Sequence, residues 1–549
     1  MSKNLKFTAK LVLGLLLINF FGNQYYKRFD LTQDKRYTLT NTTKSIVHSV
    51  ENVLNVKVYL EGDFPAEFKR LQIETKQFLE ELRAVNSNLR IQFINPDTFR
   101  EELIKKGLIP SRLTVEEDGK LSEAIIFPWA EISYQNKTNL VNLLPSSNAN
   151  SQDEQLQNAV ENLEFSFASA IKNINRKNKQ KIAVLSGNGE LQDIYLYSFL
   201  KEVATKYSLA KFTLDSVVTN PQKTLKDLTS FDLAIIAKPT IKFSDNEKLT
   251  LDQFIINGGK TLWMIDNVQA DQDSLLQTGK MLAYPRDLNL TDLLFAYGVR
   301  INTTLIKDMY ATKIPLATGN VGNKTQFQYV PWNFHPLVNG NPNHPITKNI
   351  RPVRLQFTTQ IDTLKNNIKK APLLATSLLS AKLGTPNFVE LKSIANEQNL
   401  NEYKSGKQLT AVLLEGNFKS AYKDRIKPFK TSLYKEQSSA NKMVIIADGD
   451  IAKNQLLKDQ PYDLSTDKWT QETFGNKEFL LNTVDYLLDD DGLINLRNKS
   501  LKINILDKQK TFKERSFWQL FNIVLPLVLL AIFGVIFNYL RRKKYSQRV

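Results

Sequence analysis

The chain has 549 residues, enough for roughly two to four domains with hydrophobic cores of their own. Apolar residues make up 42% of it and charged residues 23%, so any membrane segment is a minor part of a mostly soluble protein. The absence of cysteine excludes disulfides, thiolate nucleophiles and cysteine-based metal sites. The formal net charge of +17 lies partly in the two tails and forms no basic stripe interleaved with aromatic residues, so we expect no nucleic-acid partner.

The first predicted element is a membrane helix within residues 1–30. The apolar run Leu11–Tyr26 follows three lysines, as it would in a secretory signal peptide. Large polar residues follow the run, and no A-x-A-like cleavage site is present. This pattern favours an uncleaved signal anchor over a cleaved peptide.

Residues 31–150 read as a small α/β domain. In NVKVYLEG the apolar residues alternate as on a half-buried strand, the stripe from Phe68 to Val85 recurs at helical spacing, and Ile91 and Phe93 alternate again. This is a βαβ unit, which a right-handed crossover makes parallel. The outline is thioredoxin-like, but without a Cys-x-x-Cys pair redox chemistry is excluded.

A polar break leads into a predicted linking helix over 151–180, and residues 181–510 then form a larger α/β domain. Its candidate strands are continuously apolar, which is typical of a mostly parallel sheet covered by helices on both faces. They are KIAVLS, FDLAIIAK, TLWMID, LTAVLLEG and MVIIAD. Pro, Asn and Gly are frequent between about 300 and 407, which predicts an irregular insertion there.

Two glycine-containing stretches imitate nucleotide-binding loops. Gly187, Asn188, Gly189 and Glu190 follow a predicted strand, but a dinucleotide fingerprint needs a third glycine where Gln192 stands, so a structural turn is favoured over a ligand pocket. The stretch GGKT imitates the end of a Walker A motif. It follows a predicted helix with a capping box of Ser244 and Glu247 and precedes a strand, which is the wrong order for that motif. No other Walker A motif occurs, so ATP hydrolysis would belong to a partner.

Asp266, Asp448 and Asp450 follow predicted strands, at the edge where open α/β sheets place their sites. They are either turn formers or members of a pocket, and metal or acid–base chemistry would require them to converge. His335 and His344 lie nine residues apart without a third ligand, which is too few for zinc. We therefore expect no catalytic residue, metal or cofactor.

Residues 511–549 form a predicted transmembrane helix with a basic tail. Phe517–Leu540 contains 24 uncharged residues, enough to cross a hydrocarbon core of about 30 Å. RRKK follows at once, so the positive-inside rule places this end in the cytosol and the residues before Phe517 outside it. With the signal anchor, both termini would be cytosolic. The bulk of the chain would lie in the periplasm of a Gram-negative cell, on the inner membrane.

Five pieces in fixed order resemble the GldG family of auxiliary membrane subunits of ABC transporters, which is associated with gliding motility in Bacteroidota. They are RFDLTQDKRYTLT, SGNGEL, GGKTLWMIDNV, NHPIT and FLLNTVDYLLDDDGLINLRNK. Asn188 departs from the His of the family's Gly-His-Gly-Glu turn, and any role of that histidine is therefore in doubt here. The resemblance implies a separate ATPase subunit, a multi-spanning permease and a periplasmic partner in motility or export. It also implies a Rossmann-like or amidotransferase-like larger domain.

The leading hypothesis is thus a non-enzymatic membrane subunit whose α/β domains bind a substrate or partner. Ala531 and Gly534 would allow another helix to approach the C-terminal span closely, although they could equally face lipid. Two alternatives remain open. One is a membrane-tethered periplasmic enzyme that uses the strand-end acids, and the other is a solute receptor for the permease.

Overall fold

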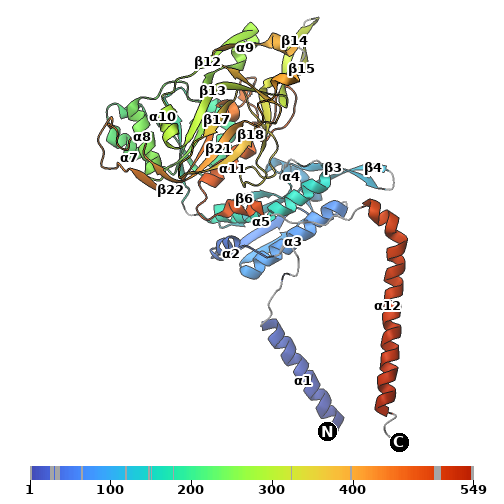
Figure 1. Cartoon of the computed structure of the whole chain (residues 1–549). Coiled ribbons are helices and arrows are strands. Elements are labelled where there is room, and N and C mark those ends of the chain that lie inside the picture. Colours follow the sequence, from blue (N-terminus) through green and yellow to red (C-terminus); the bar gives the residue numbers. More distant parts are fainter. Residues whose placement is uncertain are drawn as a thin grey trace. The chain divides into compact units, whose positions relative to one another are not determined.

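The computed structural model describes residues 3–24, 30, 38–62, 66–117, 120–145, 149, 151–176, 178–322, 324–395, 399–499 and 508–545 (Figure 1). It divides into two compact units, residues 1–500 and residues 501–549. Most of RFDLTQDKRYTLT, the expected domain start at Leu31 and Arg548 of the basic tail lie outside the described residues.

The predicted βαβ unit of the small domain is confirmed. Strands β1 (Leu54–Val58) and β2 (Leu89–Phe93) are parallel, and helix α3 (Ala66–Val85) connects them. β5 and β6 extend the sheet in the antiparallel sense, in the order β2-β1-β5-β6. The other elements of this region are α2 (Asn41–His48), η1 (Pro96–Thr98), α4 (Arg100–Lys105), β3 (Ser111–Glu117), β4 (Lys120–Ile126), β5 (Trp129–Tyr134) and β6 (Lys137–Asn142).

The expected linking helix is α5 (Gln152–Asn175), and it does more than link. Ser151 caps it by accepting a hydrogen bond from the Glu154 amide, a contribution of about 1 kcal/mol. Its apolar stripe is buried, and Phe167 packs against Phe78 of α3 with ring centroids 5.6 Å apart. Figure 1 shows α3 and α5 side by side, so α5 is part of the hydrophobic core of this region.

The large sheet contains the predicted parallel strands. Five neighbouring strands pair with one another in the parallel sense. In order across the sheet they are β22 (Gln437–Ile446), β10 (Lys260–Met264), β9 (Leu233–Ala237), β7 (Lys181–Ser186) and β8 (Ser208–Thr213). Every residue of β9 is buried, because alternate side chains enter two separate cores.

Helices cover both faces of this sheet. One core contains apolar residues of α6 and α11, and the other contains residues of α7, α8 and α10. α8 begins with the predicted capping box of Ser244 and Glu247 and ends before Gly258, which adopts a φ of +104°. The helices are α6 (Asp193–Lys206), α7 (Pro221–Leu228), α8 (Asp245–Ile256), α9 (Gln272–Thr278), α10 (Thr291–Ala296) and α11 (Asn476–Leu487), with η2 (Asp215–Val217), η5 (Asp450–Ala452) and η6 (Leu493–Asn498).

The prediction of an irregular insertion over about 300–407 is wrong, because this segment is mostly strand. β21, β18, β15 and β14 continue the large sheet beyond β22 in the antiparallel sense, and the other strands form smaller sheets. Pro, Asn and Gly occur in its strands and turns. Pro315, for example, lies on β14, which is an edge strand, and edge strands tolerate proline.

The remaining strands are β11 (Val268–Gln269), β12 (Lys280–Pro285), β13 (Val299–Asp308), β14 (Ala311–Val321), β15 (Lys324–Gly340), β16 (Val353–Arg354), β17 (Thr359–Thr363), β18 (Lys369–Ala375), β19 (Ser380–Gly384), β20 (Asn387–Glu390), β21 (Leu409–Lys419), β23 (Leu456–Leu457) and β24 (Gln460–Pro461). Two short helices, η3 (Leu391–Ala395) and η4 (Leu400–Glu402), complete the segment.

The terminal helices are α1 (Lys3–Gln24) and α12 (Lys508–Tyr545). Within the described residues, Lys510–Tyr545 is the one helix long and apolar enough to cross a membrane. None of its most apolar stretch is buried. Pro526 lies inside α12 without ending it. The predicted C-terminal membrane helix is therefore confirmed in its length and composition.

Candidate functional site

The strand-end acids predicted from the sequence do converge. Asp266 follows β10, and Asp448 and Asp450 follow the neighbouring parallel strand β22, so all three lie at one edge of the sheet. One carboxylate oxygen from each lies within 4.8 Å of the other two. All three side chains are buried, and Asp448 has no exposed surface.

Lys238 lies in the middle of these acids. It follows β9, where its backbone adopts a φ of +54°, and its side chain is only 10% exposed. Its Nζ is 2.5 Å from Oδ1 of Asp450 and 3.4 Å from Oδ2 of Asp266. A built-in ammonium group therefore neutralises part of the carboxylate cluster.

Backbone amides hold three further carboxylate oxygens, one of Asp266 and two of Asp448. The Gly449 amide donates to Asp266 Oδ1 at 2.5 Å, while Asp448 accepts from the amides of Asp450 at 2.8 Å and Gln356 at 2.5 Å. A Cβ added at Gly449 would lie 2.6 Å from Cγ of Lys238, so glycine is needed for this close approach. The cluster is a hydrogen-bonded network that joins the ends of three strands.

Burial controls the protonation of this network. It raises the pKa of Asp448 well above the usual range, and the negative charges of Asp266 and Asp450 raise it further. Burial also raises the pKa of Asp266, although Lys238 acts in the opposite direction. Burial acts to lower the pKa of Lys238, but Asp450 and Asp266 outweigh it and the pKa is raised, so the ammonium stays charged.

Three carboxylates at this spacing are a donor set suited to a divalent cation, and paired acids can also exchange protons. Here the ammonium of Lys238 already contacts two of the acids, and all four residues are buried, with none more than 8% exposed. The arrangement therefore favours a structural role: the network fixes the carboxyl ends of β9, β10 and β22 relative to one another.

The turn from Gly187 to Glu190 follows β7, which β9 separates from β10 in the sheet. Hydrogen bonds within the protein hold this turn. The carbonyl of Asn188 accepts from the amides of Thr240 and Ile241, both at 2.9 Å, and the Glu190 carboxylate accepts from the Asn188 amide at 2.8 Å. Both glycines have positive φ, and a Cβ at Gly189 would collide with the Thr240 hydroxyl. These contacts support the structural-turn interpretation.

The two histidines occupy separate settings. His335 is buried, and burial lowers its pKa to about 3. His344 accepts a hydrogen bond at Nδ1 from the Ile346 amide, and burial lowers its pKa to about 4. Neutral His344 thus shapes the NHPIT loop, and the loop brings Lys348 and Asn349 to α5.

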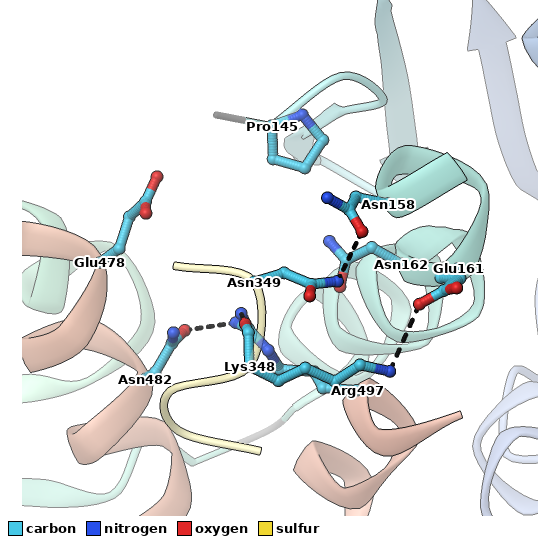
Figure 2. A pocket seen from close by; sticks show the side chains of 9 residues that line it. All are labelled: Pro145, Asn158, Glu161, Asn162, Lys348, Asn349, Glu478, Asn482 and Arg497. Atoms are coloured by element: carbon cyan, nitrogen blue, oxygen red, sulfur yellow. Dashed lines mark hydrogen bonds and ion pairs between the residues drawn. The ribbon is translucent and has the colours of Figure 1, made fainter. Parts of the chain in front are cut away.

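A cavity of about 110 Å³ lies where α5, the loop after NHPIT, α11 and η6 meet (Figure 2). Its lining is polar: two basic residues, two acidic residues and four asparagines, with one proline. These are Pro145, Asn158, Glu161, Asn162, Lys348, Asn349, Glu478, Asn482 and Arg497. The sequence did not predict this site, although it predicted α5 as the linking helix. NHPIT and FLLNTVDYLLDDDGLINLRNK, which also contribute to the cavity or adjoin it, are pieces that resemble the family.

Hydrogen bonds and ion pairs fix the walls of this junction cavity. Asn349 donates to Asn158 at 2.9 Å, and Nζ of Lys348 lies 3.3 Å from Glu161, which joins the loop to α5. On the other side, Arg497 donates to Asn482 of α11 at 2.6 Å (Figure 2). The cavity is thus built by side chains with fixed positions.

A second cavity, of about 330 Å³, is lined by β15 of the large sheet and by strands of the smaller sheets, and it has several aromatic residues in its wall. Trp332 and Phe334 of β15 pack against each other there with ring centroids 5.1 Å apart. Nζ of Lys307 is 6.0 Å from the ring centroids of both Phe334 and Tyr403. The ammonium group of Lys307 therefore already makes cation–π contacts within the protein.

A family model described as "ABC-type uncharacterized transport system" matches residues 179–483. This match covers the large sheet from β7 to most of α11. A second model, for a domain of unknown function, matches residues 33–133, which is most of the small domain. The two matches flank α5.

An uncharacterized protein of Borreliella burgdorferi is 21% identical over 532 residues, which is 94% of each chain. Two solved structures share weaker likeness. The mmIFT52 N-terminal domain is 14% identical, with a TM-score of 0.32, covering 57% of this chain and 99% of that one. A ThuA-like protein from Parabacteroides merdae is 9% identical, with a TM-score of 0.27, covering 60% and 94%.

Proposed function

This chain belongs to the ABC-type uncharacterized transport system family, whose model matches more than half of it, and we propose that it is a non-catalytic auxiliary subunit of an ABC transporter complex. The family match carries the proposal. The sequence has no Walker A motif, so the ATPase is a separate subunit, and a separate permease provides the transport path. The buried, Lys238-neutralised acids offer no open site for a reaction.

In this proposal α12 anchors the subunit in the membrane. Its apolar stretch is followed by Arg541, Arg542, Lys543 and Lys544, which favour a cytosolic C-terminus. The apolar helix α1 acts as the second anchor, so that both termini are cytosolic and residues 31–510 are periplasmic, on the inner membrane. Gly534 lies in the apolar stretch of α12 and has no side chain, which would let a permease helix approach α12 closely.

The finer assignment is a role in gliding motility. It is supported by the ordered resemblance to the GldG family, from RFDLTQDKRYTLT near the N-terminus to FLLNTVDYLLDDDGLINLRNK. A component of motility or export in the periplasm would then be a further partner of the α/β domains.

Because the chain contains no cysteine, single introduced cysteines can test its orientation in the membrane. Single cysteines replace Lys458, which is exposed in the β23–β24 turn, and Lys544 in the basic tail, and intact cells are treated with a membrane-impermeant maleimide. The proposal expects Lys458→Cys to react in intact cells and Lys544→Cys to react only after lysis. The unmodified protein is the control, because it cannot react. The reverse pattern would contradict the orientation.

A further inference from the structure

One buried carboxylate, that of Glu164 on α5, contacts two segments that lie far apart in the sequence. The first segment leads from α1 into α2: the Thr40 amide and the Thr43 hydroxyl both donate to Glu164 Oε1 at 2.8 Å. The second is the end of η6, on the way to α12, where Nζ of Lys499 donates to Glu164 Oε2 at 2.9 Å. The same ammonium donates to the carbonyl of Thr38 at 3.1 Å, so the two segments also touch each other directly.

The protein encloses these contacts. Glu164 is buried, and Thr43 has no exposed surface. A buried carboxylate is stable only while donors and a cation compensate its charge. Here the neutral donors come from one segment and the cation comes from the other. Loss of either set leaves a buried charge that the other set compensates only in part, so the two segments should loosen together.

Helix α5 connects this point to both α/β domains. Phe167, one turn after Glu164, packs against Phe78 of the small domain with ring centroids 5.6 Å apart. Glu161, one turn before it, pairs with Lys348 of the large domain at 3.3 Å. A displacement of either segment at Glu164 can therefore reach both domains through one helix.

We propose that Glu164, with Thr40, Thr43 and Lys499, forms a clasp that joins the two segments to α5 as one cooperative unit. A displacement of either terminal helix then moves α5, and the two segments do not shift independently. The inference rests on the proposed function only in treating α1 and α12 as membrane helices. Its test needs no transporter partner, so its failure is distinguishable from failure of the transporter role.

Hydrogen–deuterium exchange of the full chain in nanodiscs tests the clasp from both sides. Thr43→Val keeps the shape of the side chain but removes its donor, and it should speed amide exchange at the end of η6, residues 495–499. Lys499→Met should speed exchange at the start of α2, residues 40–44. Each increase should be about tenfold or more, as expected when a hydrogen bond to a buried charge is lost. Lys499→Arg keeps the cation and should restore slow exchange.

Lys206→Met is the matched control, because Lys206 also pairs with an acid, Asp485 at 2.7 Å, on elements away from both segments. It should leave exchange in both segments unchanged, and melting curves establish that each variant is folded. The clasp is overturned if Thr43→Val and Lys499→Met each speed exchange only in their own segment, or if Lys206→Met speeds it in both as much. An increase spread evenly over the chain would also overturn it, because that reflects general destabilisation.

Discussion

Replacing Lys238 by methionine tests whether the strand-end acids form a structural network. Methionine has nearly the same length as lysine but no charge, so the substitution leaves three buried carboxylates without the ammonium that lies 2.5 Å from Asp450 and 3.4 Å from Asp266. Removing one partner of a buried ion pair costs about 3–5 kcal/mol, because the remaining charges stay desolvated and uncompensated.

This loss converts into a melting shift. With about 2.1 cal/mol/K of unfolding entropy per residue over roughly 300 residues of the large domain, 3–5 kcal/mol corresponds to about 5–8 °C. The shift should depend on pH. Asp266 and Asp448 have folded pKa values above their unfolded values, so their contribution to stability falls as pH rises from the unfolded pKa through the folded one. Without Lys238 this window extends to higher pH, and the variant should lose more stability at pH 8 than at pH 5.

The assay is thermal unfolding of the purified full chain, followed by intrinsic fluorescence at both pH values. Lys453→Met is the matched control, because its Nζ is 3.9 Å from Asp450 and its side chain is 25% exposed, so a loss below about 1 kcal/mol is expected. A Lys238→Met protein that melts within 1 °C of the unmodified chain at pH 8 would refute the network, and a bound metal or substrate would then become the better account of the acids.

Three further outcomes follow from named contacts. Gly189→Ala should lower the melting temperature more than Gly279→Ala, because both glycines have positive φ but only the first would collide with Thr240; equal losses would count against the filled turn. Burial acts to raise the pKa of Glu164, but the Thr40 amide and Lys499 outweigh it, so its folded pKa is lowered. Its contribution is therefore present at neutral pH and lost as pH falls through the folded pKa. Glu164→Gln should cost about 2–3 kcal/mol at pH 7 and progressively less below about pH 4, and a pH-independent loss would contradict this. Gly534→Ile in α12 should reduce co-purification of a permease, while Val528→Ile should not, and unchanged recovery of both would exclude this packing contact.

Local patterns in the sequence predicted much of the fold. Continuously apolar runs such as FDLAIIAK identified the parallel strands, and Ser244 with Glu247 identified the start of α8. The segment around β14 and β15 was misread, because an edge strand tolerates residues such as Pro315 that a central strand excludes. Its pairing depends on partners distant in sequence, which composition does not reveal.

The strand-end acids and the junction cavity also differ in how far the sequence predicts them. Asp266 and Asp448 could be placed together because the carboxyl ends of parallel strands meet at one edge, whereas the insertion of Lys238 depends on its positive φ after β9. The junction cavity was missed because α5, α11 and η6 are joined only by tertiary packing. The sequence feature nearest to it was NHPIT, because the residue that follows this stretch, Lys348, forms an ion pair with Glu161 of α5.

Affinity purification of the tagged full chain from detergent-solubilised membranes, with mass spectrometry and an ATPase assay, tests the central claim most directly. The account predicts recovery of an ABC-type ATPase and a multi-spanning permease in fixed ratio with this chain, together with ATPase activity. Recovery of the chain alone in several detergents, without ATPase activity, would contradict its role as a transporter subunit.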